Sequence, residues 1–219
     1  MSDEKKPVNR LERRKQRTRA ALINAAQTFI AAGQLNVPVQ DISQAADVGI
    51  GSFYNHFDSK EQLFQTAVNE VLDAHGAMLD SLTESIEDPA EVFALSFRLT
   101  GRMFRHRPQE ARVLLNNGLA LMGSDRGLGP RATRDIATAI QAGRFQISDP
   151  ELAVAVAGGA LIGLGQLLHD QPGREDASAA DEVTENVLRL FGMSAEEAHE
   201  ICQRPLPDLG SLTRPDSAA

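Results

Sequence analysis

The sequence predicts an all-α protein, with a small N-terminal domain of three helices and a larger helical domain behind it. Apolar residues recur at intervals of three and four along most of the chain, which is the spacing of a buried helix face. Pro and Gly separate these periodic segments, and apolar-polar alternation and aromatic-rich strand patterns are missing beyond residue 84. With 219 residues, 42% of them hydrophobic, the chain can fill both cores.

The first helix is expected over residues 11–32, behind a polar arm of residues 1–9. Leu22, Ile23, Ala26 and Ile30 form its apolar face, and Gly33 is its C-terminal cap. Residues 1–30 hold eight Lys or Arg against three acidic residues, whereas residues 61–219 hold thirteen against twenty-four. Because exposed charges are screened beyond roughly 8 Å at physiological salt, this basic start can bind phosphate although the whole chain carries −8. A solvated basic tail is the alternative.

Residues 39–64, VQDISQAADVGIGSFYNHFDSKEQLF, predict two short helices joined by a tight turn and followed by a third helix. The buried positions occur at spacings of three to five: Ile42, Ala45, Ala46, Val48 and Phe53. The second short helix would carry residues 50–56. Asp58 or Ser59 then caps the third helix, with Glu61 or Gln62 in its first turn.

The second short helix has the side chains of a helix that lies in the major groove of DNA. Ile50, Ser52 and Asn55 are our candidates for base edges, where each good contact discriminates by roughly 1–3 kcal/mol. Phe53 and Phe57 are expected in the core. The alternative for the polar positions is an ordinary solvated surface.

These segments together resemble the tetracycline-repressor (TetR) family of bacterial transcription regulators. The resemblance covers residues 14–72 and rests on an ordered set at fixed spacing: an Arg- and Thr-bearing first helix ending in Ala-Ala-Gly, then Asp41-Ile42, Ala46-x-Val48, Gly51-x-x-Tyr54-x-His56-Phe57 and Ser59-Lys60-Glu61-x-Leu63. Four positions depart from the family pattern: Pro38, Ser43, Asp47 and Gly49. Asp accepts a left-handed backbone better than most residues, Pro suits a first helical turn, and Gly is an acceptable cap.

The resemblance implies further DNA contacts and a division of the chain. Phosphate or minor-groove contacts are expected from the start of the first helix, at Arg13, Arg14, Arg17 and Thr18. Phosphate contacts are expected at Gln40, Tyr54, His56 and Lys60. The expected parts are a flexible arm over residues 1–9, a helix-turn-helix DNA-binding domain over 10–64, a helical effector-binding and dimerisation domain over 65–202, and a flexible tail over 203–219.

The third helix should run on from residue 61 to about 82, as a link between the domains. Pro and Gly punctuation then predicts five more helices and a final helical turn, over residues 89–106, 108–122, 129–144, 149–170, 177–191 and 195–202.

The resemblance also implies a pocket for a small apolar or aromatic effector between residues 72 and 122. Apolar walls with a few polar handles are typical of ligand cavities, and the candidates are His75, Met78, Phe93, Phe97, Arg98, Met103, Phe104, Asn117 and Met122. For any single one of them an ordinary core position is the more common explanation, and arginines along one helix are more simply a solvated face.

Residues 152–168 carry no charge, yet they are short for a membrane span and lack basic anchors, so no membrane partner is expected. Gly159 and Gly163 would let two helix backbones approach closely. The following helix carries apolar residues at Val183, Val187, Leu190 and Phe191, and the two helices together are expected to form a homodimer interface. Packing within one chain is the alternative.

Neither an enzyme, a metal site nor a cofactor is expected. The five histidines show no metal-binding spacing, and nucleotide and hydrolase motifs are missing. The single cysteine, Cys202, and the start of the chain without an apolar leader indicate a cytoplasmic protein. We therefore predict a ligand-responsive repressor that an effector releases from a palindromic operator; the alternative is a helical ligand-binding or scaffolding dimer that does not read DNA sequence.

Overall fold

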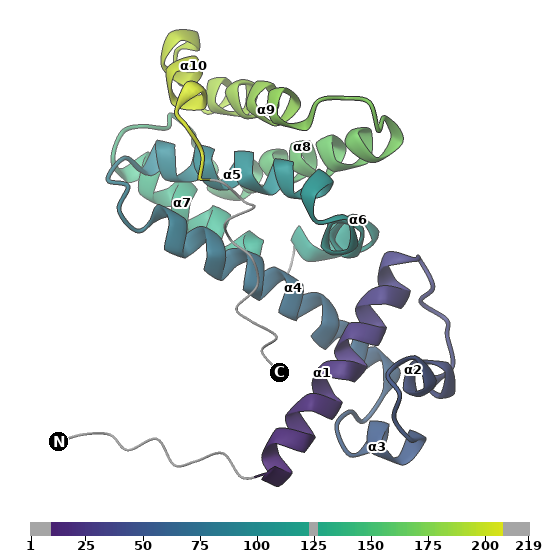
Figure 1. Ribbon diagram of the computed structural model, residues 1–219. Coiled ribbons are helices and arrows are strands. Elements are labelled where there is room, and N and C mark those ends of the chain that lie inside the picture. The colour runs from purple at the N-terminus through teal and green to yellow at the C-terminus, as the bar shows by residue number, and fades with distance from the viewer. Residues whose placement is uncertain (1–9, 123–126, 208–219) are drawn as a thin grey trace, which may run out of the picture. The chain divides into compact units, whose positions relative to one another are not determined.

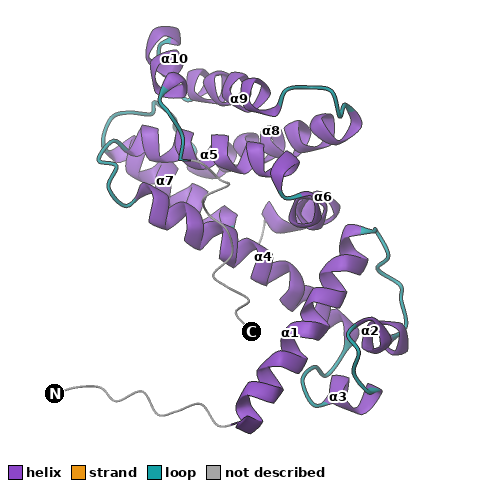
Figure 2. Cartoon of the chain, in the orientation of Figure 1, coloured by secondary structure: helices purple, strands orange, loops and turns teal. Residues whose placement is uncertain are grey.

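The computed structural model describes residues 10–122 and 127–207, and these residues form helices without any strand (Figures 1 and 2). The all-α prediction is confirmed. The helices are α1 (Arg10–Ala31), α2 (Val39–Ala45), α3 (Ile50–Tyr54), α4 (Lys60–Thr83), α5 (Pro89–His106), α6 (Pro108–Met122), α7 (Leu128–Gln141), α8 (Pro150–Asp170), α9 (Asp176–Leu190) and α10 (Ala195–Gln203).

The chain divides into two compact units, residues 1–71 and 72–219. The division falls inside α4 rather than after residue 64, so α4 begins in the first unit and ends in the second. One uninterrupted helix therefore belongs to both units.

The first unit is built on one small core. α1 packs against α2, and α2 packs against α3. The side chains in this core are fully or almost fully buried: Leu22, Ile23, Ala26, Ile30, Ile42, Phe53, Phe57, Leu63 and Ala67. Phe53 has no exposed surface and its ring lies 6.1 Å from that of Phe57, so both aromatic residues are structural, as predicted.

Backbone conformations in the first unit account for two unusual sequence positions. Gly33 ends α1 with φ +71°, and its amide bonds to the Ile30 carbonyl at 2.9 Å, as expected of a C-terminal cap. Asp47, in the turn between α2 and α3, has φ +53° and is the one non-glycine residue with positive φ in the described chain. The prediction that Asp supports a left-handed turn here is confirmed, since Asp adopts this conformation more readily than most residues.

The helices of the first unit differ in how they begin and end. Pro38 and Gly49 are the N-caps of α2 and α3, and neither has a side-chain cap bond. α3 ends at Tyr54, not at His56 as expected, because the His56 amide closes a tight turn onto the Phe53 carbonyl at 2.9 Å. α4 is capped by Ser59, whose Oγ accepts from the Gln62 amide at 3.1 Å.

The second unit is organised around α5, which packs against α6, α7, α8, α9 and α10. Asp88 caps α5 and Pro89 occupies its first turn. An aromatic cluster joins α5 to the segments after α7 and α9: the Phe93 ring lies 5.7 Å from Phe145 and 5.4 Å from Phe191. These contacts fix the α5 face that also borders the cavities described below.

The far end of the second unit is closed by α10. Cys202 lies in this core with 1% of its surface exposed, and burial raises the pKa of its thiol to about 12. The thiol is therefore protonated and shielded at neutral pH.

Candidate DNA-binding surface and effector cavity

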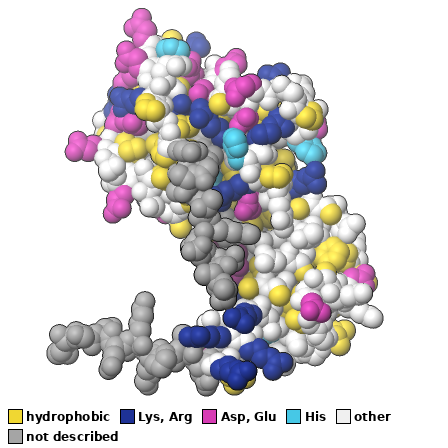
Figure 3. Space-filling model, in the orientation of Figure 1, with side chains coloured by type: hydrophobic (Ala, Val, Ile, Leu, Met, Phe, Trp, Pro, Cys, Tyr) yellow, Lys and Arg dark blue, Asp and Glu magenta, His cyan; other side chains and the backbone are white. Residues whose placement is uncertain are grey.

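The start of α1 presents a basic surface. Arg13, Arg14 and Arg17 are exposed and Thr18 is half-buried. Figure 3 shows Lys and Arg side chains gathered at this end of the first unit. Arg19 is tied to Glu70 by an ion pair of 2.8 Å and its guanidinium lies 5.4 Å from the centre of the Phe57 ring. Arg19 thus links α1 to α4 and is not available for DNA in the same way as the exposed Arg13, Arg14 and Arg17.

The short helix α3 turns its predicted contact residues outward. Ile50 is 51% exposed and Tyr54 is 59% exposed, although both are large and could have been buried. Asn55 is exposed just after the helix, and Ser52 is half-buried. The Tyr54 ring packs edge-on against Phe53 at 5.2 Å, which leaves its hydroxyl available to a partner.

Three more predicted contacts border α3. His56 is half-buried, and burial together with the charges of Lys15 and Arg19 lowers its pKa, so the ring is neutral at pH 7. Lys60 is half-buried in the first turn of α4. Gln40 is exposed, and it shares with Ile50 the rim of a groove between α2 and α3. The predicted DNA contacts thus gather around α3 and the start of α1.

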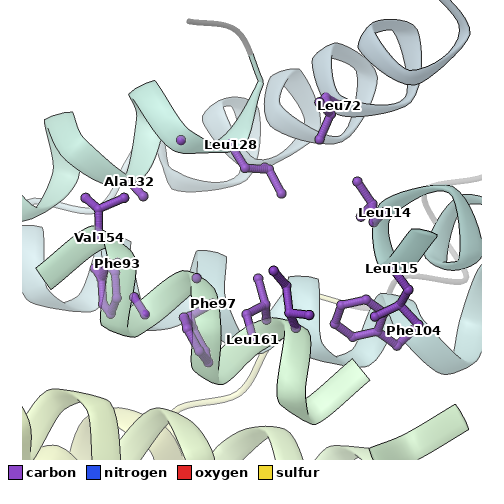
Figure 4. Close-up of a pocket in the computed structure, with 14 residues that line it drawn as sticks. Leu72, Phe93, Phe97, Phe104, Leu114, Leu115, Leu128, Ala132, Val154 and Leu161 are labelled. Atoms are coloured by element: carbon purple, nitrogen blue, oxygen red, sulfur yellow. The ribbon is translucent and has the colours of Figure 1, made fainter. Parts of the chain in front are cut away.

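The second unit holds an apolar cavity of about 120 Å³ between α4, α5, α6, α7 and α8 (Figure 4). The described residues that line it are all apolar side chains or glycines: Leu72, Phe93, Phe97, Phe104, Leu114, Leu115, Leu128, Gly129, Ala132, Val154, Ala157, Gly158, Leu161 and Ile162. We call this space the apolar chamber. It includes three of the predicted ligand-binding residues, Phe93, Phe97 and Phe104.

A second space of about 70 Å³ adjoins the first, and we call it the polar chamber. Five residues line both chambers: Phe93, Phe97, Leu128, Ala132 and Leu161. The remaining lining of the polar chamber is mainly hydrogen-bonding: Leu79, Asp80, Thr83, Ser96, Thr100, Arg131, Arg134 and Asp135.

Charged side chains of α4 and α7 form a network at the polar chamber. Arg131 Nε lies 2.8 Å from Asp80 Oδ2, and Arg134 lies 3.0 Å from both Asp80 Oδ1 and Asp135 Oδ1. Burial opposes the charge on Asp80, but hydrogen bonds from Arg131 and Arg134 outweigh it and hold the pKa of Asp80 below its usual value. At Asp135 burial prevails over the bond from Arg134 and raises the pKa. The chamber can therefore offer both donors and acceptors to a ligand.

Three other predicted ligand-binding residues, His75, Met78 and Met103, lie outside the linings of both chambers. His75 is 3% exposed and bonds through Nε2 to Thr100 Oγ1 at 2.9 Å, while its Nδ1 has no hydrogen-bond partner among the described residues. Burial lowers the pKa of His75 to about 4. Met103 is 2% exposed in the core, and Met78 packs against a cluster that includes Leu79 and Leu99. The side chains of Asn117 and Met122 lie outside the described part of the chain.

Arg98, also predicted to bind ligand, faces a different partner. Its Nε lies 2.7 Å from Asp181 Oδ1, and its Nη1 donates to the Arg204 carbonyl at 2.9 Å. Arg102 joins the same carboxylate at 2.9 Å. A buried guanidinium needs such pairing, so Arg98 ties α5 to α9 and does not reach the cavity.

Sequence reasoning missed the charged residues of the polar chamber. Arg131, Arg134 and Asp135 recur at three and four on α7, which in a sequence is typical of a solvated face. Their partner Asp80 lies on α4, some fifty residues earlier in the chain. The one available signal was the 131, 134, 135 spacing, which places all three on one face.

The structure leaves the residues of α8 predicted for a dimer interface exposed, but it buries two of the residues predicted for that interface on and just after α9. Gly159 and Gly163 are exposed, with open space where a side chain would stand. Val187 and Phe191 are 2% and 3% exposed because they pack into the core of their own subunit, so neither is available to a partner. Val183 is half-buried against that core, and Leu190 is 70% exposed.

The outward face of α8 carries a continuous apolar stripe. Leu152, Val156 and Leu167 are 61%, 40% and 36% exposed, and the two exposed glycines lie between them. By length and hydropathy α8 is able to cross a membrane, but a single such helix is weak support for a span, since apolar helices of soluble proteins have the same composition. Among the described residues, no group of three His, Cys, Asp or Glu is placed to hold a metal ion.

Comparisons with known proteins agree with this architecture. Residues 88–204 match the family profile described as "Tetracyclin repressor-like, C-terminal domain", and residues 22–67 match "Bacterial regulatory proteins, tetR family". The transcriptional repressor KstR2 of Mycolicibacterium smegmatis is 34% identical over 77 residues, which are 33% of this chain and 38% of that protein. The regulator TcmR of Streptomyces glaucescens is 32% identical over 88 residues, 40% of this chain and 38% of that protein. The chain thus matches less than half the length of these curated relatives.

A solved structure matches nearly end to end. RolR without ligand is 35% identical with a TM-score of 0.68, covering 87% of this chain and 98% of RolR. RolR in complex with resorcinol is 34% identical with a TM-score of 0.62, covering 90% of this chain and 98% of RolR. The two family profiles thus match both halves of the chain in their usual order, and RolR is similar over almost its whole length. The protein therefore belongs to the TetR family of bacterial regulators.

Proposed function

We propose that the protein is a dimeric transcriptional repressor that binds an inverted-repeat operator and is released by a small hydroxylated aromatic effector. The main support for this proposal is that α4 belongs to both the DNA-binding unit and the second unit. This helix bears Lys60 in the DNA-binding unit and lines both chambers with Leu72 and Asp80 in the other unit. A ligand that moves α4 therefore acts on the helix that holds the DNA-binding surface.

On the DNA side, α3 enters the major groove. Ile50, Ser52 and Asn55 face base edges, where good contacts each discriminate by roughly 1–3 kcal/mol. The phosphate contacts come from the surrounding residues Arg13, Arg14, Arg17, Thr18, Gln40, Tyr54, His56 and Lys60. Their exposure around α3 and the start of α1 supports this assignment.

Dimerisation occurs through the apolar stripe of α8, with Leu190 of α9 at its margin. TetR-family regulators are dimeric, and an exposed apolar stripe of this length is rarely left uncovered. Gly159 and Gly163 allow two copies of α8 to approach closely. A two-fold dimer doubles the operator and sets its half-sites about 34–36 Å apart.

The effector class follows from the polar chamber and from the resorcinol held by RolR, a benzene ring with two hydroxyls. Phe93 and Phe97 offer a ring two aromatic neighbours, and such pairs are worth about 0.5–1.5 kcal/mol each beyond burial. Asp80 and Asp135 can accept from ligand hydroxyls, and Arg131 can donate to them.

Release follows from differential binding. A hydroxyl that inserts between Arg131 and Asp80 competes with the 2.8 Å ion pair joining α7 to α4, and so favours a different α4 position. A coupling of ~1–3 kcal/mol would lower operator affinity by about 5–150-fold.

Selection of bound fragments from random DNA at near-physiological salt tests the repressor, since a sequence-reading dimer recovers one palindromic motif. The recovered site should then bind the Tyr54→Ala, Lys60→Ala double variant at least tenfold more weakly, with Gln65→Ala as an exposed control on α4. Unchanged affinity in a folded double variant contradicts the docking. Recovery of no motif, with only salt-sensitive binding, favours a ligand-binding or scaffolding dimer instead.

A further inference from the structure

We propose that the effector carries an apolar substituent that fills the apolar chamber, so that its class is an alkyl-substituted phenol rather than a bare hydroxylated ring. This inference rests on the proposed function and extends it. It comes from the relation between the two chambers.

The two chambers form one elongated site with unlike ends. The side chains common to both chambers are Phe93, Phe97, Leu128, Ala132 and Leu161. In Figure 4, Phe93 and Ala132 lie at one end of the apolar chamber, while Phe104, Leu114 and Leu115 lie at the other. A ring that lies among these shared side chains, with its hydroxyls directed into the polar chamber, has the apolar chamber beside it, and a substituent on that ring can extend toward Leu115.

The apolar chamber is a poor site for an ordered water molecule. None of the described side chains in its lining has a hydrogen-bonding group, whereas a buried water normally needs two to four polar partners. Left empty, the chamber leaves Phe104, Leu115 and Ile162 without contacts on one side. An apolar substituent restores those contacts, and a charged or hydroxylated one is rejected because its polar groups would lose their hydrogen bonds to water.

The size of the chamber limits the substituent. At about 120 Å³ it is somewhat smaller than a cavity of ~150 Å³ that accepts benzene, so it takes a chain of about four carbons. Each buried methylene raises affinity by roughly fourfold, and the four carbons of a butyl group should therefore raise it by roughly 250-fold.

A substituted ligand would also act on α4 at two points. Asp80 lines the polar chamber and Leu72 lines the apolar one, and eight residues separate them on the same helix. Positions eight apart lie close to one helix face. A ligand that fills both chambers is thus expected to release the operator at lower occupancy than the bare ring.

Calorimetric titration with resorcinol and with 4-butylresorcinol tests the inference. We expect the butyl compound to bind the wild-type protein roughly 250-fold more tightly than resorcinol. Leu115→Phe or Ile162→Phe, which fill the chamber, should remove most of this gain and leave resorcinol affinity within threefold of wild type. Two variants are used because either alone could misfold, and Leu35→Phe, at a 44% exposed position in the first unit, is the matched control.

The outcomes separate this inference from the proposed function. If resorcinol binds and releases DNA but the butyl group adds nothing, the inference fails and the repressor stands. A gain that survives both filling variants also overturns it, because the butyl group then lies elsewhere. If neither phenol binds, both the proposed effector class and this inference are wrong. The selection of bound DNA fragments then tests the repressor function independently of any ligand.

Discussion

Gly76→Ala should weaken the effector response while leaving stability almost unchanged. A Cβ on Gly76 would stand 2.5 Å from Cζ and Nη1 of Arg131, so the guanidinium must move away and release Asp80. Since these atoms are the end of a flexible side chain, movement is easy. The ion pair, in which Arg131 is 26% and Asp80 37% exposed, is worth only about 0–1 kcal/mol after solvent screening. Replacing Gly by Ala within a helix returns about 1 kcal/mol.

The two effects nearly cancel, and the melting temperature should therefore stay within about 4 °C of wild type. Effector binding loses a charge-assisted hydrogen bond of about 1.5–3 kcal/mol, which corresponds to roughly 10–100-fold in affinity. Thermal melting, calorimetry with resorcinol and operator release would be measured together. Ala74→Gly, at an exposed position of α4, isolates the helix-propensity contribution. Wild-type ligand affinity in Gly76→Ala, or a loss of stability above about 3 kcal/mol, would refute the role given to Arg131.

Three other predictions concern the turn, pH and the dimer. Asp47→Gly should raise stability by up to ~1 kcal/mol in urea denaturation, and Asp47→Val should lower it by about as much or more, because φ there is +53°. The pKa of His75 is about 4 in the folded protein and 6.5 in the unfolded chain, so between these pH values the unfolded chain binds a proton at His75 that the folded protein does not bind. The contribution of His75 to stability is therefore present above pH 6.5 and falls by about 2–3 kcal/mol as the pH drops to 4.5, a loss that His75→Gln should largely remove. Val156→Glu should convert the dimer to monomer in light scattering, and Thr138→Glu, at an exposed position of α7, should not.

The order of the helices was predictable because Pro and Gly residues mark many of the boundaries between them. Pro89, Pro108 and Pro150 each occupy the first turn of a helix, where a missing amide costs nothing, and the starts of α5, α6 and α8 follow from them. The end of α7 was less predictable. It stops at Gln141 rather than 144, since Gly143 takes φ +71° and the Arg144 amide bonds back to the Ala139 carbonyl.

The binding surfaces were predictable to different degrees. Local spacing is sufficient to choose the outward residues of α3, because buried Phe53 fixes the face of so short a helix. It cannot tell which neighbour covers an apolar face, and this is why Val187 and Phe191 were assigned to a partner although their own subunit buries them. The polar chamber depends on Asp80 meeting Arg131, a tertiary contact that no local pattern carries.

Burial of Cys202 has a practical consequence for following the motions of the second unit. It is the only cysteine in the chain, and its shielded, protonated thiol cannot react while α10 is docked. The rate at which a thiol reagent labels the native protein therefore reports how often this end of the unit opens. A ligand that stabilises the packing of the helices around α5 should slow the labelling. Local unfolding can thus be followed in the wild-type protein, without an added probe.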